Sequence, residues 1–404
     1  MRRARPGPRG HPPPPPRPAQ LPVLGLRLYA STSAGLEALL AEELGRAGFA
    51  ADLHLDRARV TFALTSVPVP PFRLLVCDRA GMAIRSAEGH FVGPRGLADV
   101  RGKLARTEFD RAFSALPAFG APAPSTFRVA AAAALACDFM FFDVKREATP
   151  IIAHRTGLSP SEEHPDVIVD VEVLPSTLHI GVALPLIPLT PPSSRLPRSV
   201  AGAVLGLAAP APHLTVCDPD CGAAELLRAW AVVAPHSRAL GLAPRPVGPA
   251  AAPHPPWVAA ASPRAWPIAD DRLSRVISLN PRLRTPVDFA GLLDETARCL
   301  APGGGAVLLI PADQAFPQAI EAQPCLVIER TVVVRDRDDR RRIVVLRREL
   351  KPPGHRTDLT AGDRARASQR LGGVVGRRRR EWRRDSGRST RHGGKSPPQE
   401  KRSS

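Results

Sequence analysis

The chain has 404 residues, 44% of them hydrophobic, which is enough apolar material for two or three domains and excludes a fibrous or wholly disordered protein. Of the net charge of +18, residues 1–20 contribute +5 and residues 351–404 contribute +11, which leaves about +2 for the part between them. Six cysteines in a chain of this length are no disulfide framework, and Cys217 and Cys221 lack the second ligand pair of a zinc ribbon. No apolar run approaches the roughly 20 residues of a membrane span. We therefore expect a cytoplasmic protein with reduced thiols, without a metal or a membrane partner.

Pro, Gly, Ser and Arg collect at the two ends of the chain. Such sequences bury too little apolar surface to become ordered, so residues 1–20 and 351–404 are predicted to be disordered. The second end contains a run of basic residues beside Trp382, namely Arg377, Arg378, Arg379 and Arg380. This run suits phosphate binding with base stacking. The alternative is that the tail only keeps the protein soluble.

Residues 21–92 are predicted to form a small α/β unit. Strands are expected at Leu24–Tyr29 and Val60–Leu64, and apolar residues at helical spacing predict a helix at Gly35–Leu44. The apolar segment Phe72–Met82 also predicts a helix.

Residues 93–190 are predicted to form a second α/β unit. Helices are expected at Val100–Leu116 and Phe139–Arg155. A strand-like stretch starts at Thr126–Ala134. Period-two alternation predicts a strand at Asp166–Val173, and Thr177–Leu184 is expected to be its partner strand.

Residues 191–350 begin with a strand that leads into a loop and a helix. The helix Val200–Leu207 precedes the strand Leu214–Cys217, the loop Asp218–Gly222 and the helix Ala223–Val232. Free backbone N–H groups and the positive end of a helix meet in such a loop. This order therefore predicts a cofactor-binding loop.

The same part continues with a parallel βαβ pattern. The strands Arg275–Leu279 and Gly305–Ile310 flank the helix Phe289–Leu300, and the glycine-rich segment Pro302–Gly305 is expected to end that helix. Two β-rich runs, Cys325–Val334 and Arg342–Leu350, predict a closing hairpin.

Several motifs occur in a specific order, namely Tyr29–Glu37, His164–Val171 with Leu178–Val182, Asp218–Gly222, Asn280-Pro281 and Arg342–Arg348. Their order and spacing resemble the THUMP-domain RNA methyltransferases, which methylate guanine in transfer or ribosomal RNA. The resemblance implies an α/β protein with a ferredoxin-like part over residues 21–92 and a THUMP module over 93–190 that binds structured RNA. Residues 191–350 would be a Rossmann-like methyltransferase domain that binds S-adenosylmethionine and ends in an antiparallel hairpin. One module would position RNA while the other acts on an unstacked base.

The resemblance assigns cofactor binding to the loop after the first Rossmann-like strand. Family members have a loop like Asp-Pro-x-Cys-Gly-x-Gly-Thr, to which Asp218, Pro219, Cys221 and Gly222 correspond. Ala224 stands at the second glycine, where its Cβ would face the cofactor. The alternative is an ordinary turn between a strand and a helix.

Two acidic residues that hold the adenosyl group in such enzymes have no counterpart here. Between Glu225 and Asp270 the sequence contains no Asp or Glu. Loss of the two charge-assisted hydrogen bonds would weaken cofactor binding by on the order of 1.5–3 kcal/mol each.

The resemblance assigns catalysis to Asn280 and Pro281. An Asn side-chain oxygen and a Pro carbonyl would accept hydrogen bonds from an exocyclic amino group and orient its nitrogen toward the methyl donor. Arg282 and Leu283 replace the second proline and the aromatic residue of the family motif. The alternative is that Asn-Pro only ends a strand.

The candidates for phosphate contact in the THUMP-like part are Arg128, Lys145, Arg146 and Arg155, and each has the alternative of an ordinary solvated side chain. The leading hypothesis is an RNA methyltransferase that acts on a guanine 2-amino group. The alternatives are a non-catalytic RNA-binding protein with the same fold and an unrelated Rossmann-like enzyme that uses another nucleotide.

Overall fold

The computed structural model describes residues 25–48, 50–66, 73–185, 196–222, 224–243, 257–260, 265–279, 286–312, 315–336 and 339–349. The chain divides into two compact units. The first comprises the residues up to Pro212 together with Glu225–His236 and Val332–Ile343. The second comprises His213–Ala224, Ser237–Thr331 and the residues from Val344 onward.

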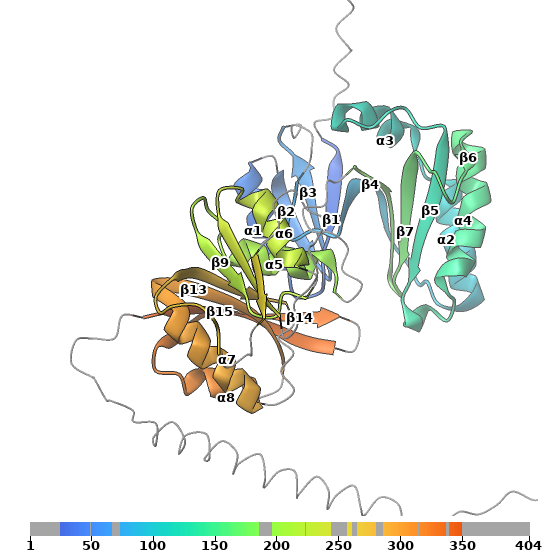
Figure 1. Cartoon of the computed structure of the whole chain (residues 1–404). Helices are drawn as coiled ribbons and strands as arrows, with labels where there is room; N and C mark the ends of the chain where they lie inside the picture. The colour runs from blue at the N-terminus through green and yellow to red at the C-terminus, as the bar shows by residue number, and fades with distance from the viewer. Residues whose placement is uncertain are drawn as a thin grey trace, which may run out of the picture. The chain divides into compact units, whose positions relative to one another are not determined.

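The first unit contains an eight-stranded sheet with the order β2-β3-β1-β4-β8-β7-β5-β6 (Figure 1). Its strands are β1 (Arg27–Ser31), β2 (Ala50–Asp56), β3 (Arg59–Leu64), β4 (Arg79–Glu88), β5 (Thr126–Ala133), β6 (Ser159–Pro160), β7 (Val167–Val173) and β8 (Thr177–Ala183). The helices of this unit are α1 (Glu37–Ala47), α2 (Gly93–Ala105), α3 (Asp110–Ala115), α4 (Phe141–Thr156), α5 (Arg198–Leu207) and α6 (Glu225–Val233), with the short 3₁₀ turns η1 (Leu116–Phe119) and η2 (Leu135–Cys137). Because β4 pairs with both β1 and β8, one sheet runs through residues 21–92 and 93–190.

The structure confirms most of the predicted elements of this unit. The predicted helix Val100–Leu116 is instead divided between α2 and α3, with residues 106–109 between them, and the predicted helix at Phe72–Met82 is wrong. Residues 73–78 form a loop, and β4 begins at Arg79. The consecutive residues Ala80, Gly81 and Met82 of β4 are all buried, so both faces of the strand are covered there and it lacks the alternation that marks a half-buried strand. Strand β2 was not predicted, because most of its side chains are exposed or half-buried and give no apolar pattern.

A polar cluster joins the two halves of the eight-stranded sheet. The buried Tyr29 hydroxyl of β1 donates a hydrogen bond to Asp170 of β7, and Arg79 of β4 forms an ion pair with the same carboxylate. The Arg59 guanidinium lies 4.5 Å from the centre of the Tyr29 ring and forms a 2.6 Å ion pair with Glu172. Burial raises the pKa of Asp170, and Arg79 partly offsets this effect. The cluster favours this pairing of strands that are distant in the sequence, because any other pairing would leave these polar side chains without their hydrogen-bond or ion-pair partners.

The second sheet of the chain has seven strands with the order β11-β10-β9-β12-β13-β15-β14. Its strands are β9 (Thr215–Asp218), β10 (Arg238–Ala243), β11 (Trp257–Ala260), β12 (Leu273–Ser278), β13 (Leu300–Pro311), β14 (Leu326–Asp336) and β15 (Asp339–Arg348). The helices α7 (Pro286–Cys299) and α8 (Ala315–Glu321) pack on each other, with the rings of Phe289 and Phe316 5.0 Å apart. The parallel pairing of β12 with β13 confirms the predicted βαβ pattern.

The predicted end of the helix at Pro302–Gly305 is wrong. Strand β13 already begins at Leu300 and runs through the glycines, where Gly305 pairs with Arg275. A register irregularity between Leu273 and Arg275 accommodates the additional residues of β13. Pairing with β12 therefore outweighs the turn preference of the glycines.

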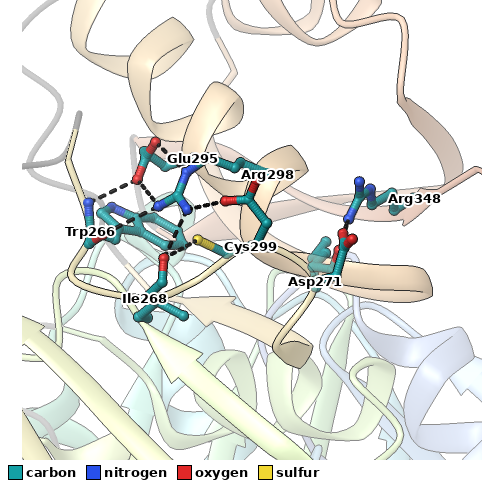
Figure 2. A network of polar contacts seen from close by, with 9 residues as sticks. Trp266, Ile268, Asp271, Glu295, Arg298, Cys299 and Arg348 are labelled. Atoms are coloured by element: carbon teal, nitrogen blue, oxygen red, sulfur yellow. Dashed lines mark hydrogen bonds and ion pairs between the residues drawn. The ribbon is translucent and has the colours of Figure 1, made fainter.

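Arg298 ties the end of α7 to the segment before β12 (Figure 2). Its guanidinium contacts Glu295 at 2.7 and 3.0 Å and donates to the carbonyl oxygens of Trp266 and Ile268 at 3.2 and 2.8 Å. Glu295 also accepts the backbone N–H of Trp266 at 2.8 Å. Burial opposes ionisation of Glu295, but the Arg298 and Trp266 hydrogen bonds outweigh burial and hold the pKa of this carboxyl below its usual value.

Substitution of Arg298 by methionine should lower the free energy of unfolding by about 2–4 kcal/mol, because the mostly buried Glu295 and two carbonyl groups lose their donor. Urea denaturation at pH 7 measures the change. The pKa of Glu295 lies below 4.5. The stabilisation of the folded state by the ionised Glu295 is therefore present above pH 4.5 and is lost as the pH falls below this value and through the lowered pKa. The Arg347→Met control removes an exposed ion pair with Glu329 and should cost under about 1 kcal/mol. An equal effect of both substitutions would contradict this account.

Candidate functional site

The second sheet has a topological switch point between β9 and β12. From β9 the chain moves to β10 and β11 on one side, and then returns to β12 on the other side of β9. All these pairs are parallel, so the carboxyl ends of the strands meet at one edge. Ligands of open α/β sheets bind at this place, because the loops leave in opposite directions and open a crevice.

Asp218 is the last residue of β9 and lies at this switch point. It is 4% exposed, and burial raises the pKa of its carboxyl to about 7. Its Oδ1 accepts the backbone N–H of Asp220 at 3.1 Å, while the charge of Asp220 opposes ionisation further. Among the described residues no cation acts on this pKa. A buried carboxyl in this state is suited to hold a ligand's positive charge.

The loop after Asp218 is fixed by its own backbone. Cys221 donates its N–H to the carbonyl oxygen of Leu242 in β10 at 3.0 Å, and Ala224 donates to Cys221 at 2.6 Å. Gly222 has a φ of +49°, and a Cβ there would meet no atom within 4 Å. Ala224 has a φ of +57° although it is not glycine, and it is 3% exposed. The backbone therefore adopts the left-handed conformation that glycine favours, and the open space lies beside Gly222.

The fit of S-adenosylmethionine to these residues differs between its two ends. Its ammonium and sulfonium groups are cations, which suits the buried carboxyl of Asp218 and the space beside Gly222. Its ribose lacks the usual acidic partner, because β10 ends at Ala243 and no Asp or Glu follows before Asp270. Asp270 itself forms an ion pair with Arg298. The residues present therefore fit the charged end of the cofactor.

Ser278, the last residue of β12, is a polar residue near the site that no sequence motif indicated. This residue is fully buried, and within the described part of the chain its hydroxyl has no hydrogen-bond partner. Unpaired buried hydroxyls are rare in proteins, which makes Ser278 a further polar group at the switch point. A serine two residues before Asn280 was the available signal, but serine at a strand end is too common to stand out.

The structure brings together some of the predicted site residues and leaves others outside the described residues. Asp218, Pro219, Cys221 and Gly222 form one loop. Asn280 and Pro281 lie outside the described residues, as does the run Arg377–Arg380. By sequence, Asn280 follows the end of β12, the strand next to β9.

The four candidates for phosphate contact lie in the first unit, on β5 and α4. Lys145 forms a 2.7 Å ion pair with Glu162, whose carbonyl oxygen accepts a hydrogen bond from Arg128 at 3.4 Å. Arg146 pairs with Asp143 at 3.0 Å. Arg155 is exposed in the last turn of α4 and has no ion pair within the described ranges. Arg128 and Arg155 therefore each present a charge that no carboxylate offsets within those ranges.

No protein-family model matches the chain, and no curated protein is similar to it in sequence. TrmN from Thermus thermophilus is similar in structure, with 20% sequence identity and a TM-score of 0.58 over 80% of this chain and 99% of that chain. A predicted N6-adenine-specific DNA methylase from Listeria monocytogenes str. 4b F2365 has 12% identity and a TM-score of 0.52, over 81% and 96% of the two chains. SMU.472 in complex with SAH has 12% identity and a TM-score of 0.51, over 81% and 98%.

The chain shares their fold. The predicted α/β fold class is thereby confirmed, with one α/β module built on the eight-stranded sheet and a Rossmann-like sheet that ends in the hairpin of β14 and β15. None of the described helices is long and apolar enough to cross a membrane. Within the described residues no cluster of three or more His, Cys, Asp or Glu side chains could hold a metal ion.

Proposed function

We propose that this protein is an S-adenosylmethionine-dependent methyltransferase that acts on RNA. The observation that carries the proposal is the buried carboxyl of Asp218 at the switch point of a methyltransferase-like sheet. S-adenosylmethionine, when bound, supplies the methyl group and carries the cationic groups that this carboxyl would hold. The complex of SMU.472 with SAH supports this cofactor, because that protein shares the fold.

The proposed acceptor is an exocyclic amino group of a base, namely the 2-amino group of guanine in transfer or ribosomal RNA. Asn280 follows β12 and would accept a hydrogen bond from the amino group, together with the Pro281 carbonyl. These acceptors would orient the nitrogen lone pair toward the methyl donor. Arg128, Lys145, Arg146 and Arg155 are the proposed phosphate contacts of the THUMP-like part, with Arg377–Arg380 in the C-terminal tail.

The first test is a calorimetric titration of the full chain with S-adenosylmethionine up to millimolar concentration. Binding should require Asp218 and should be lost in Asp218→Asn, whereas Asp220→Asn should retain it. Since the carboxyl must be ionised to hold a cation, affinity should rise about tenfold between pH 6 and pH 8 around a pKa of about 7. Absence of binding in the wild-type chain, or equal binding by Asp218→Asn, would reject the proposal.

The second candidate is a non-catalytic RNA-binding protein that retains the fold. The observation in its favour is the absence of any Asp or Glu between Glu225 and Asp270, which removes the usual ribose contact. Retained RNA binding by a chain that binds no S-adenosylmethionine would support this candidate.

A further inference from the structure

Four arginines surround a pocket of about 450 Å³ in the first unit, far along the chain from Asp218. They are Arg27 of β1, Arg85 of β4, Arg106 after α2 and Arg111 in α3. Glu108 is the one acidic side chain among the described residues that line the pocket. The lining therefore has a net charge of +3.

The strand pairing places Arg85 at the wall of this pocket. The pairing of β4 with β8 has an irregularity just before Arg85, so that Arg85 lies opposite Ile180 while Met82 lies opposite Val182. Arg85 is thereby on the same face of the sheet as Met82, which also lines the pocket. Its guanidinium donates a 3.1 Å hydrogen bond to the carbonyl oxygen of Arg106. This bond holds the segment after α2 beside the strand.

Glu108 offsets only part of the positive charge of the pocket within the described part of the protein. None of its four arginines forms an ion pair there, whereas Arg59, Arg79 and Arg298 each pair with a carboxylate. Four cations around one cavity repel one another, and an anion in the cavity removes this repulsion. The planar guanidinium group matches the geometry of phosphate oxygens. The charge pattern thus favours a phosphate group.

The volume of the pocket and its apolar lining residues indicate a ligand larger than phosphate alone. A volume of about 450 Å³ lies in the range of small-molecule sites. Leu26 and Ile84 contribute apolar lining next to the arginines. An apolar wall beside a basic wall suits a nucleotide, whose base is apolar on its faces and whose phosphate is anionic.

We propose that this pocket binds the phosphate of a nucleotide, with Arg85, Arg106 and Arg111 around the phosphate and Leu26 and Ile84 beside the nucleoside. A free nucleotide and the 5′-terminal nucleotide of an RNA strand present the same phosphate. The site is separate from Asp218 and does not depend on methyl transfer.

The test is a calorimetric titration of the full chain with adenosine 5′-monophosphate and with adenosine, at fixed salt concentration. The monophosphate should bind and adenosine should not. The double substitution Arg106→Gln with Arg111→Gln should weaken monophosphate binding on the order of tenfold or more. The matched control, Arg95→Gln with Arg101→Gln, removes two exposed charges of α2 that do not line the pocket and should change binding less than about twofold.

Two further measurements are needed. The first distinguishes a free nucleotide from the end of an RNA strand, and the second tests the site without relying on a variant that folds. A single-stranded RNA 12-mer with a 5′-phosphate should bind more tightly than the same strand with a 5′-hydroxyl if the pocket takes a strand end, and equally if it takes a free nucleotide. Displacement of the monophosphate by pyrophosphate on the wild-type chain tests the site without any variant. No displacement, equal binding of adenosine, or equal losses in both double variants would overturn the proposal. S-adenosylmethionine binding should be unchanged in both double variants.

Discussion

The Asp218→Asn variant should be more stable than the wild-type chain at pH 8, by about 1–3 kcal/mol, even though it loses a carboxyl of the proposed site. A rise in the pKa of Asp218 from 3.8 to about 7 corresponds to about 4 kcal/mol of destabilisation when the group is ionised. Asparagine is neutral and can still accept the backbone N–H of Asp220. Its buried amide group then offsets part of the gain, by about 1–3 kcal/mol.

The difference in stability between Asp218→Asn and the wild-type chain should depend on pH. The folded state binds the proton of Asp218 more tightly than the unfolded state, so the destabilisation is absent below about pH 3.8, grows up to about pH 7 and is complete above it. Urea denaturation of both chains at pH 5 and pH 8 should therefore show a larger difference at pH 8. Saturating S-adenosylmethionine should narrow the difference by stabilising only the wild-type chain. A variant that is less stable than wild type at pH 8 would show that another group of the folded protein stabilises the ionised Asp218 carboxylate by a hydrogen bond or an ion pair.

The Gly202→Ala variant should lose about 3 kcal/mol or more of stability, because no room exists for a methyl group at this position of α5. A Cβ at Gly202 would lie 1.7 Å from the carbonyl oxygen of Leu75 and 2.4 Å from its carbonyl carbon. The loop around Leu75 has little freedom to retreat, since the carboxylate of Glu43 accepts the backbone N–H groups of Leu75 and Val76 at 2.6 and 2.9 Å. Urea denaturation measures the loss.

Gly206, one turn further along α5, provides the matched control. A Cβ there would meet only the Leu75 Cδ1 atom, at 3.9 Å, which is an ordinary contact. Alanine has a higher helix propensity than glycine, so Gly206→Ala should gain about 0.5–1 kcal/mol. Similar effects of the two substitutions would mean that α5 does not pack against the Leu75 loop as the structure shows.

Elements with a local pattern were predicted correctly from the sequence. Strand β7 alternates valine with other residues in the sequence, and the helix α1 has apolar residues at helical spacing, so that each of these patterns defines one element. The loop Asp218–Gly222 was also found, because its residues are contiguous and follow a buried strand. In each case the signal lies within about ten residues of chain.

Elements whose identity depends on distant partners were not predicted correctly. Strand β4 forms because β1 and β8 pair with it, and the β13 residues 300–305 are extended because β12 pairs with them. The arginine pocket joins Arg27 to Arg111 across more than 80 residues, and no local pattern connects them.

The sequence by itself determined the α/β class, the concentration of charge at the two ends and the place of the loop Asp218–Gly222, which is proposed to bind the cofactor, because composition and short-range periodicity encode all three. Only the tertiary structure decided that Asp218 is buried with no cation acting on it among the described residues, that Ser278 lies on the strand next to it, and that four arginines share one pocket. Burial and electrostatic environment arise from residues brought together by strand pairing, and this information does not exist at any single position of the chain.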